Sequence, residues 1–166
     1  MRLIVGFLFV VFLFAPAEFA QNNSWLERLE RIKPFYTDQS QVESILGKPK
    51  NHYSNVAEFE TKDGTVSVFY SKGTCDGTNP NQFDLPKDVV ISFDFHPSRK
   101  TKFTKLGLDL TRFIKEPSPD VVGTTGYSDL ERGVYFSVTS DIVKFVQFSG
   151  PKNVTVPTCS GSKTQL

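Results

Sequence analysis

Few side chains in this 166-residue chain have the types and the spacing that catalysis requires. His52 and His96 are the two imidazoles, and neither has a second histidine or a cysteine at metal-ligand spacing. Glu58 and Glu60 share one face of a predicted strand, but alternating glutamates are typical of a solvated strand face rather than of a glycosidase. The motifs of serine hydrolases, zinc proteases, P-loop proteins and dinucleotide-binding proteins are absent from the sequence. We therefore predict no catalytic residues and interpret the chain as a non-enzymatic protein.

A loop from Cys75 to Asp84 is rich in the oxygen donors that calcium prefers. Its donors do not follow the tight spacing of a calcium-binding loop. Asparagine, aspartate and glycine also favour turns, because their side chains or backbones tolerate turn geometry, and this explains the composition. We predict no metal site and no cofactor here. The donors are Asp76, Asn79, Asn81 and Asp84.

The first 20 residues are typical of a secretory signal peptide. Arg2 precedes 12 apolar residues, and small residues follow at 15–17. A membrane-spanning helix needs about 20 apolar residues, so a cleaved signal is favoured over an anchor. We expect a periplasmic or secreted protein with no membrane insertion after cleavage.

Cys75 and Cys159 are the two cysteines. In an oxidising compartment an even cysteine count predicts a disulfide, here between Cys75 and Cys159. The alternative is a pair of free or redox-active thiols. It is the weaker interpretation, because the sequence has no C-x-x-C arrangement.

The charge of the chain gives no indication of a nucleic-acid partner. The formal net charge is +1, and no basic stripe or charge run occurs. A chain of this length is normally one domain with one core. We assign residues 1–20 to the signal peptide, 21–159 to a single domain and 160–166 to a flexible tail.

Two helices are predicted near the mature N-terminus. The first covers residues 24–33, with capping-box spacing between Ser24 and Glu27, and is ended by Pro34. The second begins after an N-cap at Thr37 or Asp38 and is followed by Gly47 and Pro49. Both helices are short and amphipathic, so we expect them to pack on a sheet.

The rest of the chain alternates as strands do. Asp63-Gly64 is a hairpin signal between residues 59–61 and 65–70, and further strands are expected at 89–95, 133–138 and 142–148. Residues 98–111 could be a strand or an irregular packed segment. The fold class predicted is α+β, with two N-terminal helices packed on an antiparallel sheet of about six strands.

A weak internal repeat is visible when the two halves are aligned. Residues 59–70 resemble 127–138, and 89–97 resemble 142–151. The pattern is consistent with a tandem helix/hairpin repeat. Chance similarity between antiparallel hairpins is the alternative, since alternation and glycine turns recur for physical reasons.

The stretch from Thr37 to Tyr70 resembles the SmpA/OmlA family of small envelope proteins. The related β-lactamase inhibitor proteins use a similar unit twice. The resemblance implies a helix pair on one face of an antiparallel sheet and a role in protein contacts rather than catalysis. The outer-membrane assembly members carry a lipobox cysteine that this chain lacks. The resemblance depends on Thr37, Val42, Leu46-Gly47 and Pro49, followed by an aromatic strand and the Asp63-Gly64 hairpin.

Strand alternation predicts where a partner would bind. If the helices cover the face that bears Val66 and Val68, then Phe69 and Tyr135 emerge on the opposite face, and Phe145 joins them. Exposed aromatic residues suit protein recognition because they bring large, rigid contact area. Alternatively, the 98–127 connection or the N-terminal segment covers these side chains and makes a second small core.

These observations predict an exported, non-enzymatic protein that binds another protein. Two alternatives belong to other classes: a small extracytoplasmic hydrolase and a small-ligand carrier. A hydrolase would require a side chain of strongly perturbed pKa in a pocket, and a carrier would require a large apolar cavity.

Overall fold

The computed structural model describes residues 24–75, 83–118, 121–159 and 163–165. The predicted signal peptide and the oxygen donors at Asp76, Asn79 and Asn81 lie outside the described residues. In the described part of the chain, no helix has the length and apolar character needed to cross a membrane.

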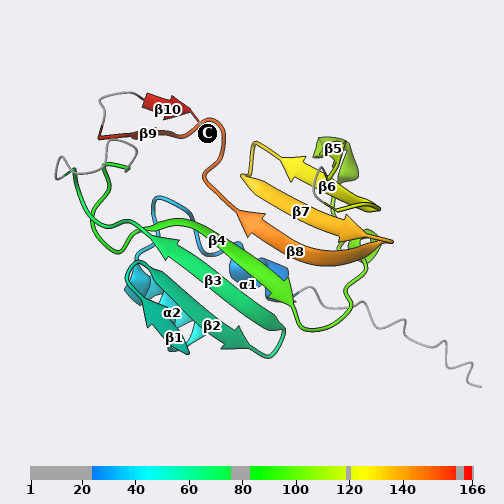
Figure 1. The fold of residues 1–166 in the computed structure, drawn as a ribbon, viewed down its shortest axis with the longest axis horizontal. Helices are drawn as coiled ribbons and strands as arrows, with labels where there is room; N and C mark the ends of the chain where they lie inside the picture. Colours follow the sequence, from blue (N-terminus) through cyan, green and yellow to red (C-terminus); the bar gives the residue numbers. More distant parts are fainter. Residues whose placement is uncertain (1–23, 76–82, 119–120, 160–162, 166) are drawn as a thin grey trace, which may run out of the picture.

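An antiparallel sheet of eight strands forms most of the fold (Figure 1). Its strand order is β1-β2-β3-β4-β8-β7-β6-β5. The strands are β1 Asn51–Tyr53, β2 Val56–Thr61, β3 Gly64–Tyr70, β4 Val90–Pro97, β5 Ile114–Pro117, β6 Thr124–Asp129, β7 Val134–Thr139 and β8 Ile142–Phe148. The first four strands form one meander and the last four another, and pairing of β4 with β8 joins the two.

The predicted α+β class is wrong, because the fold is mainly β. Helix α1 (Ser24–Leu29) has 6 residues and α2 (Gln39–Leu46) has 8, against a sheet of eight strands. The first helix was expected to reach residue 33. It stops at Leu29 because the amides of Arg31 and Ile32 bond to carbonyls three residues back, and Pro34 cannot continue a helix.

Helix α2 has the caps that its sequence indicates. Asp38 is the N-cap: its carboxylate accepts a hydrogen bond from the backbone N–H of Gln41 at 2.9 Å. The Gln41 side chain in turn accepts from the backbone N–H of Asp38. Gly47 follows the helix with φ of 90°, and its N–H donates to the carbonyl of Glu43. Local sequence therefore defines where this helix begins and ends.

The tandem helix/hairpin repeat is also wrong. The strands do correspond between the halves, since β2, β3 and β4 occupy positions equivalent to β6, β7 and β8. Among the described residues, no α-helix directly precedes the second set. The segment 98–111, which the sequence left open, contains two 3-10 helices, η1 (Phe103–Lys105) and η2 (Leu110–Arg112).

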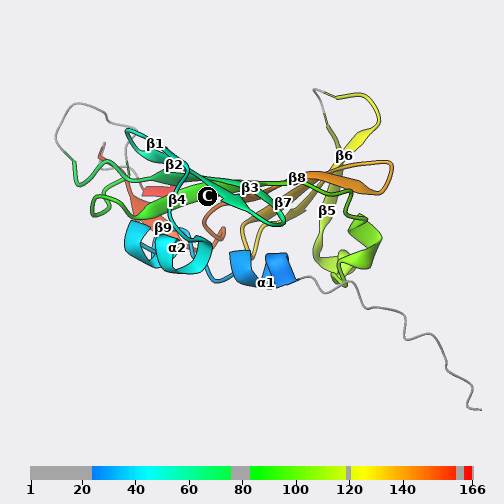
Figure 2. The same ribbon diagram turned by 90° about the horizontal axis from the view of Figure 1, so that it is seen from below.

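The core lies between the sheet and the helices. Figure 2 shows α1, α2 and the 3-10 segment on one side of the sheet. Trp25 of α1 stacks on Phe95 with ring centroids 4.7 Å apart, and Phe103 of η1 packs against Phe136. The buried strand residues on this face include Phe59, Val66, Val68, Tyr70, Phe93, Val134, Val138, Val146 and Phe148.

Cys75 and Cys159 form a disulfide, which confirms the predicted pairing. Their Cα atoms are 5.3 Å apart, and 84 positions separate them in sequence. The C-terminal part also contains β9 (Thr155–Pro157), which pairs with β10 (Lys163–Gln165). Strand β10 lies within the predicted flexible tail, and residues 160–162 and 166 lie outside the described residues.

Candidate functional site

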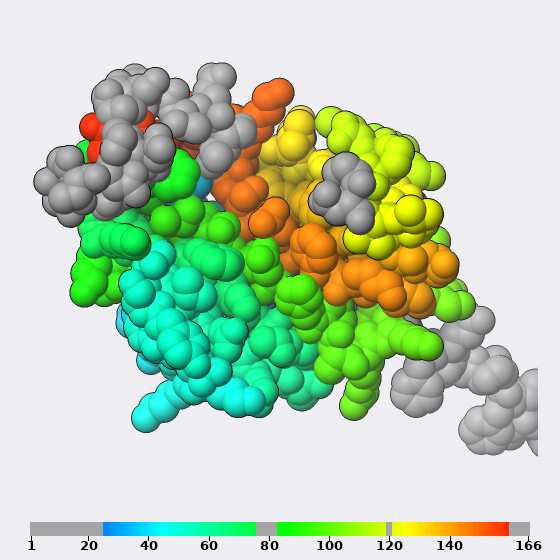
Figure 3. All heavy atoms as spheres, in the orientation of Figure 1, coloured from blue at the N-terminus to red at the C-terminus, as the bar shows by residue number. Residues whose placement is uncertain are grey.

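The sheet face opposite α1 and α2, here called the outer face, carries the three predicted partner-binding residues. Phe69, Tyr135 and Phe145 are each partly exposed, while their strand neighbours Val68 and Phe136 are buried on the helix side. Within the described chain, no helix or strand lies over the outer face (Figure 2). Figure 3 looks onto this face, where the middle strands of the sheet reach the molecular surface.

Two of the three predicted residues come together, and the third stands apart. The rings of Tyr135 and Phe145 have centroids 5.7 Å apart. His96 of β4 extends this group, with its ring 5.7 Å from that of Phe145. Phe69 instead lies opposite Ser92, four residues along β4 from His96. The aromatic row therefore consists of His96, Phe145 and Tyr135.

Sequence reasoning considered His96 only as a possible metal ligand and did not place it with the aromatic residues. Its place in the row depends on the pairing of β4 with β8, in which Phe95 lies opposite Val146. No local pattern in the sequence indicates that pairing. The alternation of Asp94 and His96 would have shown only that both side chains share a face.

Gly126 of β6 provides the space that the Tyr135 ring occupies. A Cβ atom built at Gly126 would lie 2.7 Å from the Tyr135 ring and 2.9 Å from its hydroxyl. Glycine permits close approach in a strand, because it has no side chain on either face. The ring of Tyr135 thus packs closely against β6 at one end of the aromatic row.

Asp94 is a partly buried carboxylate in the middle of the outer face. It lies opposite Ser67 on β3 and Gln147 on β8. Its Oδ1 atom is enclosed and has no hydrogen-bond partner among the described residues. Burial raises the pKa of Asp94, and this outweighs the opposing effects of the Gln147 side chain and of His96. A carboxyl group of raised pKa on an open face is a candidate functional residue.

The Asp94→Asn variant is expected to be more stable than the wild-type protein at pH 7. Because the folded-state pKa of Asp94 lies above the unfolded value, the folded protein binds this proton more tightly. The associated stability is present at low pH and is lost as the pH rises through the folded pKa. Urea unfolding across this range should show a variant advantage that grows with pH.

Asp109 is a suitable control, because its pKa is shifted in the opposite direction from that of Asp94. The Thr111 hydroxyl, 2.6 Å away, and the Thr111 backbone N–H both donate to the carboxylate and lower the pKa of Asp109. Its stability contribution is therefore present at neutral pH and is lost as the pH falls. Asp109→Asn should be less stable than wild type at pH 7, with a gap that closes in acid. If Asp94→Asn were also less stable than wild type at pH 7, with a difference that disappears in acid, a raised pKa of Asp94 would be contradicted.

The two glutamates that the sequence analysis considered have structural partners. Glu58 accepts a hydrogen bond from the Asn51 side chain at 2.9 Å, and Glu60 forms an ion pair with Lys50. His52 is exposed on β1. Among the described residues, no group of three His, Cys, Asp or Glu side chains is placed to hold a metal ion.

Tyr70 has a strongly perturbed pKa but does not reach the surface. Burial and the nearby carboxylate of Glu43 raise its pKa, and its hydroxyl has no hydrogen-bond partner among the described residues. Only 1% of Tyr70 is exposed. Its location within the core keeps a substrate from contacting the hydroxyl.

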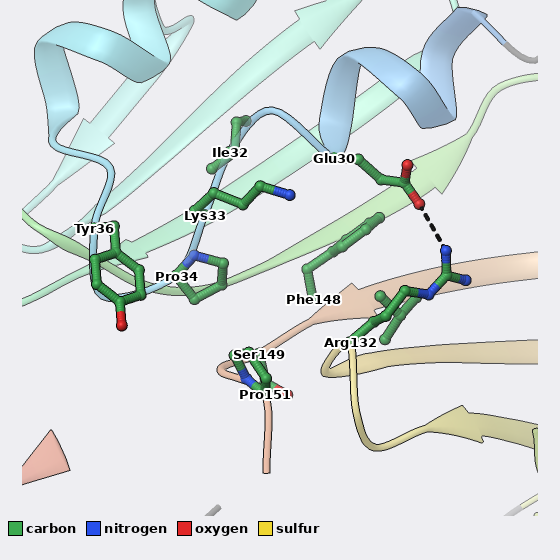
Figure 4. A pocket seen from close by; sticks show the side chains of 10 residues that line it. Glu30, Ile32, Lys33, Pro34, Tyr36, Arg132, Phe148, Ser149 and Pro151 are labelled. Carbon is green, nitrogen blue, oxygen red and sulfur yellow. Dashed lines mark hydrogen bonds and ion pairs between the residues drawn. The ribbon is translucent and has the colours of Figure 1, made fainter. Parts of the chain in front are cut away.

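A pocket of about 370 Å³ lies on the helix side, between the α1–α2 connection and the ends of β7 and β8 (Figure 4). This volume is within the range of small-molecule sites, which begins at about 300 Å³. Its lining is mostly apolar and includes Ile32, Pro34, Tyr36, Val134, Phe148 and Pro151, with the charged residues Glu30, Lys33 and Arg132.

An ion-pair network holds one wall of the pocket. Arg132 donates from Nε to Asp129 at 2.8 Å and from Nη1 to Glu30 at 3.3 Å. Asp129 is only 1% exposed, and Arg112 approaches it at 3.6 Å. The Arg132 guanidinium is therefore fixed in direction by a buried carboxylate.

Sequence reasoning missed this pocket. Glu30 and Arg132 are 102 positions apart, so no spacing in the chain relates them. The one local feature is Phe35, which has a positive φ of 70° without being glycine. Strained backbone of this kind is often found near functional sites, but it cannot be read from residue type.

Comparisons with protein-family models, with curated proteins and with solved structures give no match to this chain. The resemblance to the SmpA/OmlA family stays a prediction.

Proposed function

We propose that this chain is an exported, non-enzymatic protein that binds another protein through the outer face of its sheet. The observation that carries the proposal is the aromatic row of His96, Phe145 and Tyr135, which no helix or strand of the described chain covers. Aromatic side chains dominate binding at protein interfaces, because they bury large areas at low entropic cost. A solvated sheet face would ordinarily carry polar residues at these positions.

Asp94 and Gln147 add polar groups beside the row. Adjacent aromatic and polar groups give an interface both apolar contact and hydrogen-bond specificity. An enclosed carboxylate oxygen that has no hydrogen-bond partner among the described residues also supports a role in recognition, since a partner could supply the missing donor. This part of the proposal rests on the position of Asp94 between Ser67 and Gln147 on the outer face and on its unpartnered Oδ1 atom.

Export is supported by two features. The disulfide between Cys75 and Cys159 fits an oxidising compartment, where disulfides persist. Residues 1–20 have the pattern of a secretory signal. We place the protein outside the cytoplasm, in the periplasm or the external medium.

Removal of the aromatic row is expected to abolish partner capture while the protein stays folded. Tyr135→Ser combined with Phe145→Ala removes two of the three rings, and partly exposed positions of this kind usually cost only about 1 kcal/mol each. The immobilised wild-type protein and the double variant are incubated with an envelope or culture-fluid extract, and captured proteins are identified by mass spectrometry. Denaturant unfolding checks the stability of each.

Gly126→Ala is the companion variant, because it displaces a ring without removing it. The new Cβ forces the Tyr135 ring off β6, so it should weaken capture although every aromatic side chain remains. Lys62→Gln, in the exposed β2–β3 turn, is the control and should capture as wild type does. Undiminished capture by the folded double variant would refute the proposal.

A further inference from the structure

We propose that the protein partner of the outer face presents an arginine, whose guanidinium binds the Asp94 carboxylate and packs on the neighbouring rings of His96 and Phe145. This inference rests on the proposed function, because it names the chemistry of the partner that the same face would bind. It depends on the strand register around Asp94, on the hydrogen bond that its carboxylate lacks and on the charge of the face.

The register of the sheet brings Asp94 next to the aromatic row. Strands β4 and β8 lie side by side in the middle of the sheet (Figure 1). Asp94 lies opposite Gln147 on β8, and Gln147 lies opposite Tyr135 on β7. His96 is two residues further along β4 and so points to the same face, and its ring is 5.7 Å from that of Phe145. Asp94 therefore has ring neighbours on its own strand and on the adjacent one.

Asp94 lacks the partners that a carboxylate needs at a partly buried position. The Gln147 side chain hydrogen-bonds to the carboxylate, but Oδ1 has no hydrogen-bond partner among the described residues. None of the ion pairs of the described chain includes Asp94. A partly buried charge without a counterion is unfavourable, and a guanidinium both neutralises a carboxylate and donates hydrogen bonds to it. An arginine of the partner would supply both.

The outer face carries more negative than positive charge. Its strands carry two lysines: Lys115, whose ammonium lies over the Tyr127 ring on the helix side, and Lys144, which is exposed on β8. Lys50, just before β1, pairs with Glu60. Counting Lys50 and Lys144 on the outer face still leaves four carboxylates against two ammonium groups, an excess that favours a cationic partner. The four carboxylates, placed on this face by register, are Glu58, Glu60, Asp94 and Glu116.

Arginine suits this site better than lysine does. Its guanidinium is planar, stacks on aromatic rings and can donate two parallel hydrogen bonds to one carboxylate. On the outer face a carboxylate and two rings lie together, and no helix or strand of the described chain covers them (Figure 2). Lysine would provide the charge but not the flat contact with the rings.

Acetyl-Gly-Arg-Gly-amide is a suitable probe, with a citrulline peptide as its neutral counterpart of similar shape and a lysine peptide as its charged one. Heteronuclear NMR titration of the purified protein should show saturable shifts at the amides of Asp94, His96 and Phe145, with a dissociation constant of about 1 mM for the arginine peptide. Binding should weaken with salt. The lysine peptide should bind more weakly, and the citrulline peptide should cause no saturable shifts.

Three variants locate the site. Asp94→Asn should weaken binding of the arginine peptide about tenfold, as loss of one charge-assisted hydrogen bond does. Phe145→Ala should reduce the preference for arginine over lysine. Glu27→Gln removes one negative charge at an exposed position of α1, on the helix side, and should bind as wild type does. The proposal is overturned if the citrulline peptide binds as the arginine peptide does, if Asp94→Asn keeps wild-type affinity, or if the shifts lie away from the outer face.

Partner capture separates this inference from the proposed function. If Asp94→Asn captures the same protein as wild type with equal efficiency, an arginine at Asp94 is refuted and the proposed function stands. If the wild-type protein binds the arginine peptide but captures no protein from the extract, the proposed function fails although the face recognises arginine.

Discussion

Replacement of Cys75 and Cys159 by serine is expected to lower the free energy of unfolding by about 4–5 kcal/mol. The disulfide closes a loop across 84 positions, and a cross-link of that span removes much of the conformational freedom of the unfolded chain. It also links the segment after β3 to the segment after β9. An antiparallel β-bridge between Phe83 and Thr158 joins the same two segments. Urea unfolding of both proteins measures the difference.

Reduced and alkylated wild-type protein is the control for the serine substitutions. It should unfold at a denaturant concentration close to that of the double variant, because both lack the cross-link. The double variant should keep its strand content, since the core between sheet and helices does not include either cysteine. A loss of less than about 1 kcal/mol would contradict the entropic account of this disulfide.

Phe93→Ala is expected to cost about 3–5 kcal/mol of stability. Phe93 is fully buried and stacks on Phe148 with ring centroids 4.4 Å apart. The two residues are also opposite one another where β4 pairs with β8, the contact that joins the two meanders. Removing the ring leaves a cavity where the two meanders join. The short pairing of β4 with β8 cannot close this cavity without strain.

Phe145→Ala is the matched comparison. It makes the same substitution on the outer face, where the ring is partly exposed, so the expected loss is about 1 kcal/mol. The pair also decides between the two interpretations of the aromatic row. Equal losses at Phe93 and Phe145 would mean that the outer face is a second core. Denaturant unfolding at one pH provides both values.

The sequence by itself determined the features that depend on near neighbours in the chain. Helix α2 has its N-cap at Asp38, one of the two residues that the sequence indicated, and its C-cap at Gly47, and the turn before Gly64 joins β2 to β3. These follow from residues a few positions apart, whose backbone preferences act locally. The disulfide was also predictable, because a single pair of cysteines permits one pairing.

Only the tertiary structure decided the fold class, the aromatic row and the pocket. Helix length was overestimated because apolar spacing continued to Ile32, although the chain turns before Pro34. His96 meets Phe145 through pairing of distant strands, and Glu30 meets Arg132 across 102 positions. Such contacts depend on how the whole core packs, and residue type and spacing carry no information about which distant strand becomes a neighbour.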